Sequence, residues 1–244
     1  MKEALHREYL EEDHWWFSAR RGIFRRMLSA FAPLPRDARV LDVGPGSGIN
    51  LPVLRDCGEV TALDLSPFSL AHCREAGARH LVQADAANPP FDRETFDLVC
   101  VLDVLEHLAD DAGALQAYRR ILKPQGFLLL SVPALACLWG RQDVISGHHR
   151  RYRRGALSRL LVDSGFRIER LTYFNTLLLP PILAVRLLMR PFLRWTSNGG
   201  SDLSMPMLGL DRLVHRALTF EGGWILKHDL PLGVSLLALA RPEP

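Results

Sequence analysis

The spacing of apolar positions changes near Arg39 and divides the chain into two regions. Up to Phe31 the apolar residues partly follow helical spacing, which predicts one or two helices, and two prolines within residues 32–36 end this region. From Arg39 onward, short apolar runs alternate with helix-like segments, a pattern typical of a parallel sheet with crossover helices. The runs predicted as strands are Val40–Val43, Glu59–Leu63, His80–Gln83, Phe96–Leu102, Phe127–Val132, Phe166–Tyr173 and Gly233–Ala240.

The segments between these runs complete an α/β fold. They predict helices at Leu51–Asp56, Pro67–Ala76, Asp110–Leu122 and Gly155–Gly165. The stretch between the last two strands is far longer than a hairpin needs, so a mostly helical insertion is expected at about residues 174–232. We therefore expect a Rossmann-like, seven-stranded, mostly parallel sheet with helices on both faces. Residues 1–36 are expected to form an N-terminal helical extension or lid, and residues 37–244 the main domain.

Composition favours one core domain and argues against several classes of protein. The 244 residues are 48% hydrophobic, which is enough for one full α/β domain with an insertion. The net charge of +3 is too small to indicate a nucleic-acid partner. Cys57, Cys73, Cys100 and Cys137 lack metal-ligand spacing, so we expect buried free thiols of a reducing compartment and no metal site. The N-terminus shows no secretory pattern, and the expected location is the cytoplasm. An oligomeric state is not predicted.

The insertion begins with an apolar segment at residues 176–195 that contains two prolines and Arg186, Arg190 and Arg194. It is too short and too charged for a membrane span. Arginines four residues apart would share one helix face, which favours a peripheral contact with the inner face of an anionic membrane or a cover over an apolar substrate. A helix that packs on the core or at a dimer interface remains an equal alternative. A loop rich in Gly, Ser and Asn at 196–204 and another helix at 208–220 follow.

The stretch Val40–Asn50 indicates chemistry, because an apolar strand runs directly into three glycines. Gly44, Gly46 and Gly48 allow a ligand to approach bare backbone, as nucleotide cofactors do. The dinucleotide fingerprint needs its third glycine where Ile49 stands, and this spacing argues against NAD.

Carboxylates follow three successive predicted strands at the edge where parallel sheets bind ligands. Asp42 suits a cationic or amino-bearing group, Asp64 suits the two hydroxyls of a ribose, and Asp85 with its neighbour Ala86 suits an adenine amino group. Each aspartate alone could be a helix cap. Three of them at successive strand ends favour a ligand site.

Several motifs occur in the order found in one known family. They are Leu41–Gly48, Asp64, Ala84–Ala86, Phe96–Val99, Leu105–Leu108 and Leu122–Phe127. Together they cover roughly residues 38–133 and resemble the class I S-adenosylmethionine-dependent methyltransferases, in particular the small-molecule branch that includes the quinone-ring methyltransferases.

The resemblance implies S-adenosylmethionine as cofactor, S-adenosylhomocysteine as product and a methyltransferase domain at 37–244. It places the cofactor's methionyl and ribose parts at Gly44, Gly46 and Gly48, with Asp42 near the amino group. It further implies contacts to the ribose from Asp64, to the cofactor from the neighbouring Leu65, to the adenine from Asp85 and Ala86, and to the methionine from the backbone of Leu102. The amino-group methyltransferase motif Asn-Pro-Pro-Tyr is missing after the fourth strand, which disfavours nucleic-acid substrates.

Three histidines are candidates for the general base. His107 follows the fourth strand, and His148 and His149 lie in the segment Gly-His-His-Arg-Arg-Tyr after the fifth. An imidazole titrates near neutral pH and can accept a proton. His107 could instead be a packing residue, and the His-Arg segment could be a solvated helix start.

Large aromatic and basic side chains are candidates for contacts with the acceptor. Arg150, Arg151 and Tyr152 follow the two histidines and suit an anionic group. Trp15 and Trp16 could belong to a lid over the substrate or pack the first helix on the sheet.

Taken together, the sequence predicts transfer of the methyl group of S-adenosylmethionine to a small, amphipathic or lipid-linked acceptor at oxygen or carbon. Two alternatives stay open. One is a non-catalytic protein of the same fold that binds cofactor or membrane, and the other, less favoured, is a nucleotide-dependent oxidoreductase.

Overall fold

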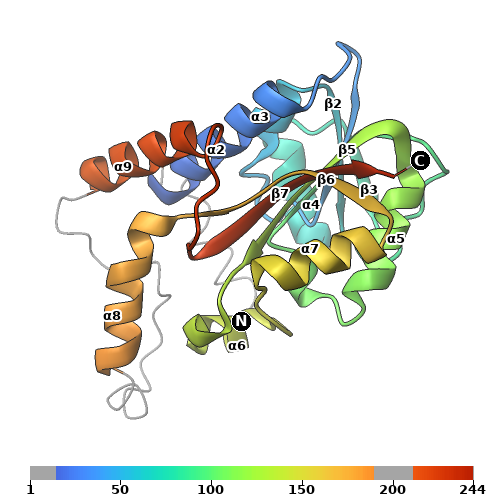
Figure 1. Cartoon of the computed structure of the whole chain (residues 1–244). Coiled ribbons are helices and arrows are strands. Elements are labelled where there is room, and N and C mark those ends of the chain that lie inside the picture. Colours follow the sequence, from blue (N-terminus) through green and yellow to red (C-terminus); the bar gives the residue numbers. More distant parts are fainter. Residues whose placement is uncertain (1–14, 190–210, 244) are drawn as a thin grey trace.

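A seven-stranded sheet forms the centre of the computed structural model, which describes residues 15–189 and 211–243 (Figure 1). The strands are β1 (Arg39–Val43), β2 (Glu59–Asp64), β3 (His80–Gln83), β4 (Phe96–Leu102), β5 (Leu122–Pro133), β6 (Phe166–Phe174) and β7 (Ser235–Pro242). Their order is β3-β2-β1-β4-β5-β7-β6, with β1 to β5 parallel and β7 antiparallel to both neighbours. The predicted fold class is confirmed. This strand order also places the carboxyl ends of β1 and β4 side by side, and ligands of such sheets bind in the crevice at this position.

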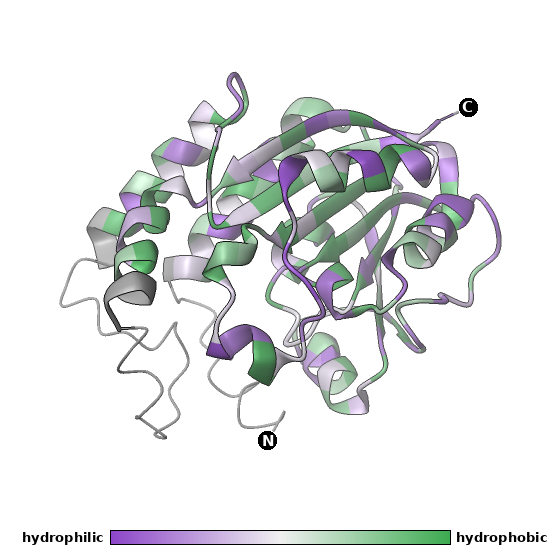
Figure 2. Ribbon diagram, turned by 60° about the horizontal axis from the view of Figure 1, so that its bottom comes forward, coloured by the Kyte–Doolittle hydropathy of each residue, from purple (hydrophilic) through white to green (hydrophobic). Residues whose placement is uncertain are grey.

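Helices cover both faces of the sheet. The helices of the described ranges are α2 (Trp15–Phe31), α3 (Leu51–Arg55), α4 (Pro67–Glu75), α5 (Asp111–Ile121), α6 (Arg141–Ser146), α7 (Arg154–Asp163), α8 (Leu179–Met189) and α9 (Asp211–Trp224), with 3₁₀ turns η1 (Leu105–His107), η2 (Ala136–Leu138) and η3 (Thr176–Leu178). Helix α8 projects away from the sheet (Figure 1). Successive strand residues point to opposite faces. Leu41 therefore belongs to the core shared with Tyr118 of α5, whereas Val40 belongs to the core shared with Phe24 of α2. Figure 2 shows the hydrophobic residues along the strands and hydrophilic ones on the outer faces of the helices.

The N-terminal helix and the insertion form a common layer. Helix α9 lies beside α2 (Figure 1), although almost 200 residues separate them in the chain. Trp16, Leu178 and Leu218 form a small buried cluster between α2, η3 and α9. The N-terminal helix and the insertion, which lie far apart in the sequence, therefore pack against each other.

Two details differ from the prediction. Strand β5 begins at Leu122, five residues before the predicted start at Phe127, because Leu122 already pairs with Phe96 ahead of an irregularity in the register.

The four cysteines are free, but only Cys73 and Cys100 are buried. The expectation of burial was wrong for Cys57, which is half-buried in the turn after α3, and for Cys137, which is exposed in η2.

The predicted membrane segment is described only in part. Residues 176–189 form η3 and α8, whereas Arg190 and Arg194 lie outside the described residues, as do the loop predicted at 196–204 and the first part of the helix predicted at 208–220. None of the helices in the described ranges combines the length and the apolar character that crossing a bilayer requires. A peripheral contact through residues 176–195 stays a prediction.

Candidate active site

The glycine loop between β1 and α3 has a conformation that favours glycine at all three positions. The φ angles of Gly44, Gly46 and Gly48 are +62°, +57° and +76°. The Gly44 amide donates a hydrogen bond of 2.8 Å to the carbonyl of Leu63, which fastens the loop to β2. A Cβ atom on Gly44 would lie 2.6 Å from the side chain of Val104. The bare backbone of this loop is therefore a requirement of its packing against the loop after β4.

A cavity of about 190 Å³ lies over this loop at the carboxyl edge of the sheet. Its lining includes Gly44 and Gly46 of the loop, Leu102 at the end of β4, and Phe17 and Arg20 of α2. The structure thus brings together three residues predicted to bind the cofactor and covers them with the N-terminal helix. Figure 1 shows α2 beside α3, which the glycine loop precedes.

Asp42 is buried in β1, directly before the glycine loop. Its Oδ2 atom is buried and receives no hydrogen bond from any residue that the structure describes. Burial, with a further contribution from the charge of Asp64, raises the pKa of Asp42 from 3.8 to about 8. A buried carboxyl oxygen without a hydrogen bond is costly, and a ligand that brings a cationic amino group would satisfy it.

The other predicted cofactor residues lie at the ends of β2 and β3. The Oδ1 atom of Asp64 accepts a hydrogen bond of 2.8 Å from the Ser66 amide, and the next side chain, Leu65, is 67% exposed. Asp85 is exposed and accepts a hydrogen bond of 2.9 Å from the amide of residue 87. The carbonyl of Ala86 accepts a hydrogen bond of 2.8 Å from Tyr118 of α5. Both carboxylates stabilise turns, and their predicted roles at ribose and adenine stay predictions.

Arg20 fastens α2 to the sheet at the cavity. It forms an ion pair with Asp103, and its Nη2 donates to the Ser131 hydroxyl at 3.2 Å, while that hydroxyl donates to Asp103 at 3.2 Å. Trp16 and Phe24 flank Arg20 on the same face of α2, and its guanidinium lies 5.7 and 5.4 Å from their ring centroids. From the sequence, Arg20 and the N-terminal aromatics were expected either to pack the first helix on the sheet or to form a lid, and no partner for the arginine was predicted. Its place between aromatic residues at intervals of four was the available signal.

Asp103 has a backbone conformation that is uncommon for a non-glycine residue. Its φ is +57°, and its amide donates to the carbonyl of Ser131 at 2.9 Å. Such conformations persist where surrounding contacts hold them, often at functional sites. The sequence analysis gave no role to the side chain of Asp103, yet this residue lines the cavity and its carboxylate binds Arg20.

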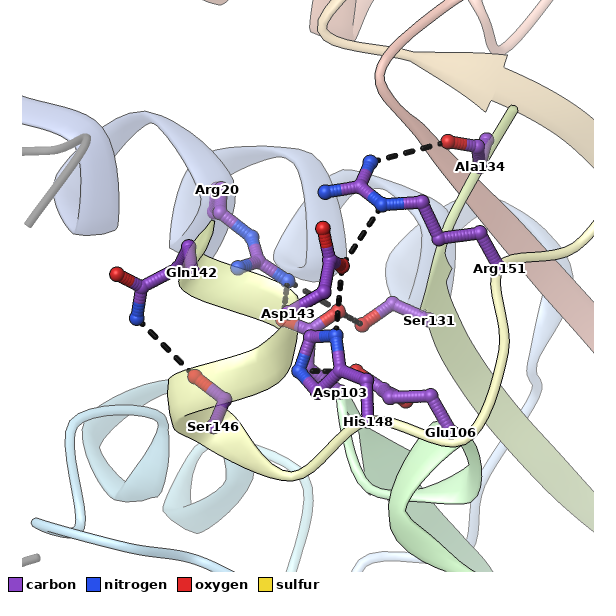
Figure 3. A network of polar contacts seen from close by, with 10 residues as sticks. All are labelled: Arg20, Asp103, Glu106, Ser131, Ala134, Gln142, Asp143, Ser146, His148 and Arg151. Atoms are coloured by element: carbon purple, nitrogen blue, oxygen red, sulfur yellow. Dashed lines mark hydrogen bonds and ion pairs between the residues drawn. The ribbon is translucent and has the colours of Figure 1, made fainter. Parts of the chain in front are cut away.

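A second polar group lies next to this network (Figure 3). Asp143 of α6 is fully buried, and its Oδ1 accepts hydrogen bonds from His148 Nδ1 at 2.9 Å and from Arg151 Nε at 2.8 Å. Its Oδ2 accepts from the Gly140 amide at 2.8 Å. Burial alone would raise the pKa of Asp143, but these hydrogen bonds outweigh it and lower the pKa to about 2. Asp143 is therefore ionised and fixes the orientation of the imidazole.

Glu106 lies between the two networks. Its side chain is fully buried in η1, and neither carboxylate oxygen has a hydrogen-bond partner within the described part of the chain. His148 Nε2 faces Glu106 Oε1 at 3.9 Å, beyond hydrogen-bond distance. Burial, together with the nearby charge of Asp103, raises the pKa of Glu106 well above its usual range. Sequence analysis named His107 here and overlooked the preceding glutamate.

The structure separates the predicted acceptor-site residues into two groups. His107 and His148 lie together, with ring centroids 4.6 Å apart. His149 is exposed, and its amide donates to the carbonyl of Glu106 at 2.8 Å. Two further predicted residues bind α5, since the side chains of Arg150 and Tyr152 lie 2.7 and 2.8 Å from the carboxylate of Asp111.

The remaining acceptor-site predictions concern Arg151 and the N-terminal aromatic pair. Arg151 is engaged with Asp143 and with the carbonyl of Ala134 at 3.1 Å. Trp16 packs in the cluster that joins α2 to the insertion, and the side chain of Trp15 lies outside the described residues. Contacts of these residues with an acceptor stay predictions.

A larger cavity of about 470 Å³ lies elsewhere, against α7 and β6. It is open and lined by charged residues that pair with each other, including Arg154 with Asp229 at 2.6 Å. None of the glycine-loop, Asp103 or histidine-cluster residues lines it. We therefore assign the ligand site to the smaller cavity.

The fold and the glycine-loop cavity define a class of protein, the nucleotide-cofactor-binding α/β proteins with one antiparallel strand near the edge of the sheet. Comparison with known proteins narrows the class. Residues 15–171 match the family model described as "Methyltransferase domain". This is more than half of the chain, and the chain belongs to that family.

Two curated relatives and one solved structure illustrate the similarity. A probable S-adenosylmethionine-dependent methyltransferase of Mycobacterium tuberculosis is 29% identical over 161 residues, covering 64% of this chain and 57% of the relative. A malonyl-[acyl-carrier protein] O-methyltransferase of Enterobacter lignolyticus is 39% identical over 150 residues, covering 58% and 59%. The chain thus aligns with about three fifths of each relative's length. A putative methyltransferase solved in complex with the Haloferax volcanii Trm112 methyltransferase activator shares the fold, with a TM-score of 0.64, 19% identity and coverage of 99% and 96%.

Membership of the family implies S-adenosylmethionine as cofactor and S-adenosylhomocysteine as product. The residues of this site fit such a ligand. The Oδ2 atom of Asp42, which has no hydrogen-bond partner among the described residues, suits its amino group, and the glycine loop offers a cradle of bare backbone. The resemblance found in the sequence is confirmed at the level of the family.

Proposed function

We propose that this protein transfers a methyl group from S-adenosylmethionine to an oxygen atom of a small amphipathic acceptor. The observation that carries the proposal is the cluster of the buried Glu106 with His107 and His148 beside the cofactor cavity. Asp103 connects the two regions, since it lines the cavity and is near enough to Glu106 for its charge to raise the pKa of Glu106. Groups that bind or deprotonate a hydroxyl or carboxyl thus lie close to the place where the donor is expected.

Methyl transfer requires that the acceptor oxygen be aligned with the methyl carbon and that a hydroxyl acceptor lose its proton. S-adenosylmethionine supplies a methyl group that its sulfonium makes electrophilic. The acceptor oxygen forms the new bond to the methyl carbon, the carbon–sulfur bond breaks, and its electron pair stays on sulfur. A hydroxyl acceptor must also lose its proton. The chain contributes orientation through the glycine loop and α2, and polar groups for the oxygen through the histidine cluster.

Two further observations support this choice of acceptor. The relative from Enterobacter lignolyticus is named as an O-methyltransferase. The insertion contributes apolar surface near α2, where Leu178 packs against Trp16 and the neighbouring Leu177 is 52% exposed. An acceptor with an apolar part could lie along this surface. The family match also supports methyl transfer over the oxidoreductase alternative.

The test uses S-adenosylmethionine with an isotopically labelled methyl group and a panel of phenols, catechols, fatty acids and acyl thioesters with a free carboxylate. Mass spectrometry locates the label. We expect an ether or an ester, and we expect Glu106→Gln and His148→Asn to lose turnover while they still bind S-adenosylhomocysteine. His80→Asn, an exposed histidine at β3, is the matched control and should keep turnover. A label on carbon or nitrogen, or full turnover in both cluster variants, would contradict the proposal.

A further inference from the structure

The cluster beside the cofactor cavity has the composition of a metal site. Glu106, His107 and His148 each offer one ligand atom, and these atoms all lie within 4.8 Å of one another. Ligand atoms that share one ion at about 2.1 Å lie about 3 to 4 Å apart. The 3.9 Å between Glu106 Oε1 and His148 Nε2 is already in this range. Small side-chain movements would bring the third ligand atom into place.

The carboxylate of Glu106 needs a partner that the described protein does not provide. Both of its oxygens are buried and lack hydrogen bonds within the described ranges. An ionised carboxylate in such a position is strongly disfavoured unless a cation compensates it. Figure 3 shows Glu106 directed toward His148. A cation between them would compensate the charge of the carboxylate and would also be coordinated by the Nε2 atom of His148.

The orientation of His148 is the arrangement found in metal-binding histidines. Its Nδ1 is hydrogen-bonded to the buried carboxylate of Asp143 at 2.9 Å, which leaves Nε2 toward Glu106. A metal-bound histidine almost always donates its other ring N–H to a carboxylate or carbonyl. Arg151 and the Gly140 amide hold Asp143 in turn. The protein therefore already holds the imidazole of His148 with its Nε2 atom directed toward Glu106.

The charges around the cluster also favour a cation. The Arg20–Asp103 ion pair is neutral as a unit. Glu106 and Asp143 carry two negative charges when ionised, and Arg151 balances one of them. A divalent ion would change this net charge from −1 to +1. That charge suits the oxygen anion of an acceptor.

We propose that Glu106, His107 and His148 bind one divalent transition-metal cation, with Asp143 as the carboxylate that orients His148. Two imidazoles and one carboxylate suit Zn²⁺, Mn²⁺, Co²⁺ or Fe²⁺ better than Mg²⁺ or Ca²⁺, which prefer oxygen ligands alone. Three protein ligands leave a coordination position open, as in catalytic metal sites.

The role of this ion rests on the proposed function. An acceptor hydroxyl bound at the open position would release its proton to solvent more readily, because the metal stabilises the oxygen anion. The anion would then attack the methyl carbon in the step described above, with no oxidation or reduction of the metal. The sequence analysis expected no metal site, because the cysteines lack metal-ligand spacing; the cluster becomes visible only when the fold brings His148 to Glu106 and His107.

The experiment titrates tag-free, chelator-treated full-length protein with Co²⁺ and with Zn²⁺. Visible absorption reports the Co²⁺ coordination, and calorimetry gives the Zn²⁺ affinity and stoichiometry. We expect one ion per chain. Glu106→Gln and His148→Asn should each weaken binding at least about 100-fold, and Asp143→Asn by about 10- to 100-fold. The adjacent His149→Asn is the matched control for metal affinity and should change it less than twofold.

Binding of S-adenosylhomocysteine shows that each variant is folded, and His107→Asn replaces any variant that fails this check. The proposal is overturned if no stoichiometric binding occurs, or if binding survives in both Glu106→Gln and His148→Asn. Undiminished O-methylation by the metal-free protein would refute the metal's role and leave the proposed function standing. Metal binding without O-methylation of any acceptor would support the site and contradict the proposed function.

Discussion

Binding of the cofactor should release a proton from Asp42. In the free protein, burial raises the pKa of this carboxyl to about 8, so the group is mostly neutral at pH 7. An ammonium group placed beside its unpartnered oxygen would stabilise the carboxylate and lower the pKa again. The perturbation that isolates this effect is Asp42→Asn, which keeps the shape of the side chain and cannot ionise.

The size of the effect follows from the raised pKa. With a pKa near 8, about 0.9 proton is bound at pH 7 and is released when Asp42 ionises. The affinity for S-adenosylhomocysteine should then rise roughly 50-fold between pH 6 and pH 8, because the ionised fraction rises by that factor. Calorimetry in two buffers of different ionisation enthalpy measures the released proton directly. Asp42→Asn should release none and should lose this pH dependence.

The same carboxyl should affect the stability of the protein without ligand. Its pKa is about 8 when folded and near 3.8 when unfolded, so its stabilising contribution is complete below pH 4 and is lost as the pH rises through 8. Between pH 6 and pH 8 this loss amounts to about 2 kcal/mol, which urea denaturation can measure. Asp42→Asn should remove it.

A matched ligand tests the cause of the proton release. Methylthioadenosine lacks the amino-acid part of S-adenosylhomocysteine and should bind without releasing a proton. The reasoning fails if proton release is the same in Asp42→Asn as in the unmodified chain, or if methylthioadenosine releases the same amount.

Three other changes have defined outcomes. Arg20→Ala should lower the free energy of unfolding by about 2 to 3 kcal/mol, because it leaves the partly buried carboxylate of Asp103 without its cationic partner. Arg25→Ala on the same helix removes an exposed ion pair and should cost less than about 1 kcal/mol. Equal costs of the two substitutions in urea denaturation would contradict this reasoning. Gly44→Ala should lower cofactor affinity at least about tenfold in calorimetry, because its φ is +62° and the new Cβ would lie 2.6 Å from a neighbouring side chain. Gly155→Ala, where a Cβ meets nothing within 4 Å, is its control and should change the affinity little. A maleimide should label Cys137 in the native protein, and mass spectrometry should find the buried thiols labelled only after denaturation.

Local sequence was sufficient for the parts of the site that lie on a single strand or loop. The glycine loop was predictable because G-x-G-x-G after an apolar strand depends on positive φ angles that glycine adopts readily. Asp42 and Leu102 were predictable as site residues because the carboxyl ends of parallel strands share one edge. The start of β5 was not, because Lys123, Pro124 and Gln125 resemble a turn, and the strand begins earlier only through the pairing of Leu122 with Phe96 of β4.

The hydrophobic period of the chain determined the fold class and most strand positions, the glycine spacing indicated a nucleotide cofactor, and the resemblance of the ordered motifs to a known family named S-adenosylmethionine. Only the tertiary structure decided which charged side chains meet. Arg20 and Asp103 are 83 positions apart, and Glu106 and His148 are 42 apart, yet each pair lies together at the same edge of the sheet. The physical reason is that burial and partner geometry give these groups their chemistry, and both arise only when distant elements pack. The burial of Glu106 in particular could not be predicted from the sequence. An acidic residue in a short turn such as η1 becomes buried only when residues from distant elements pack around it and exclude water.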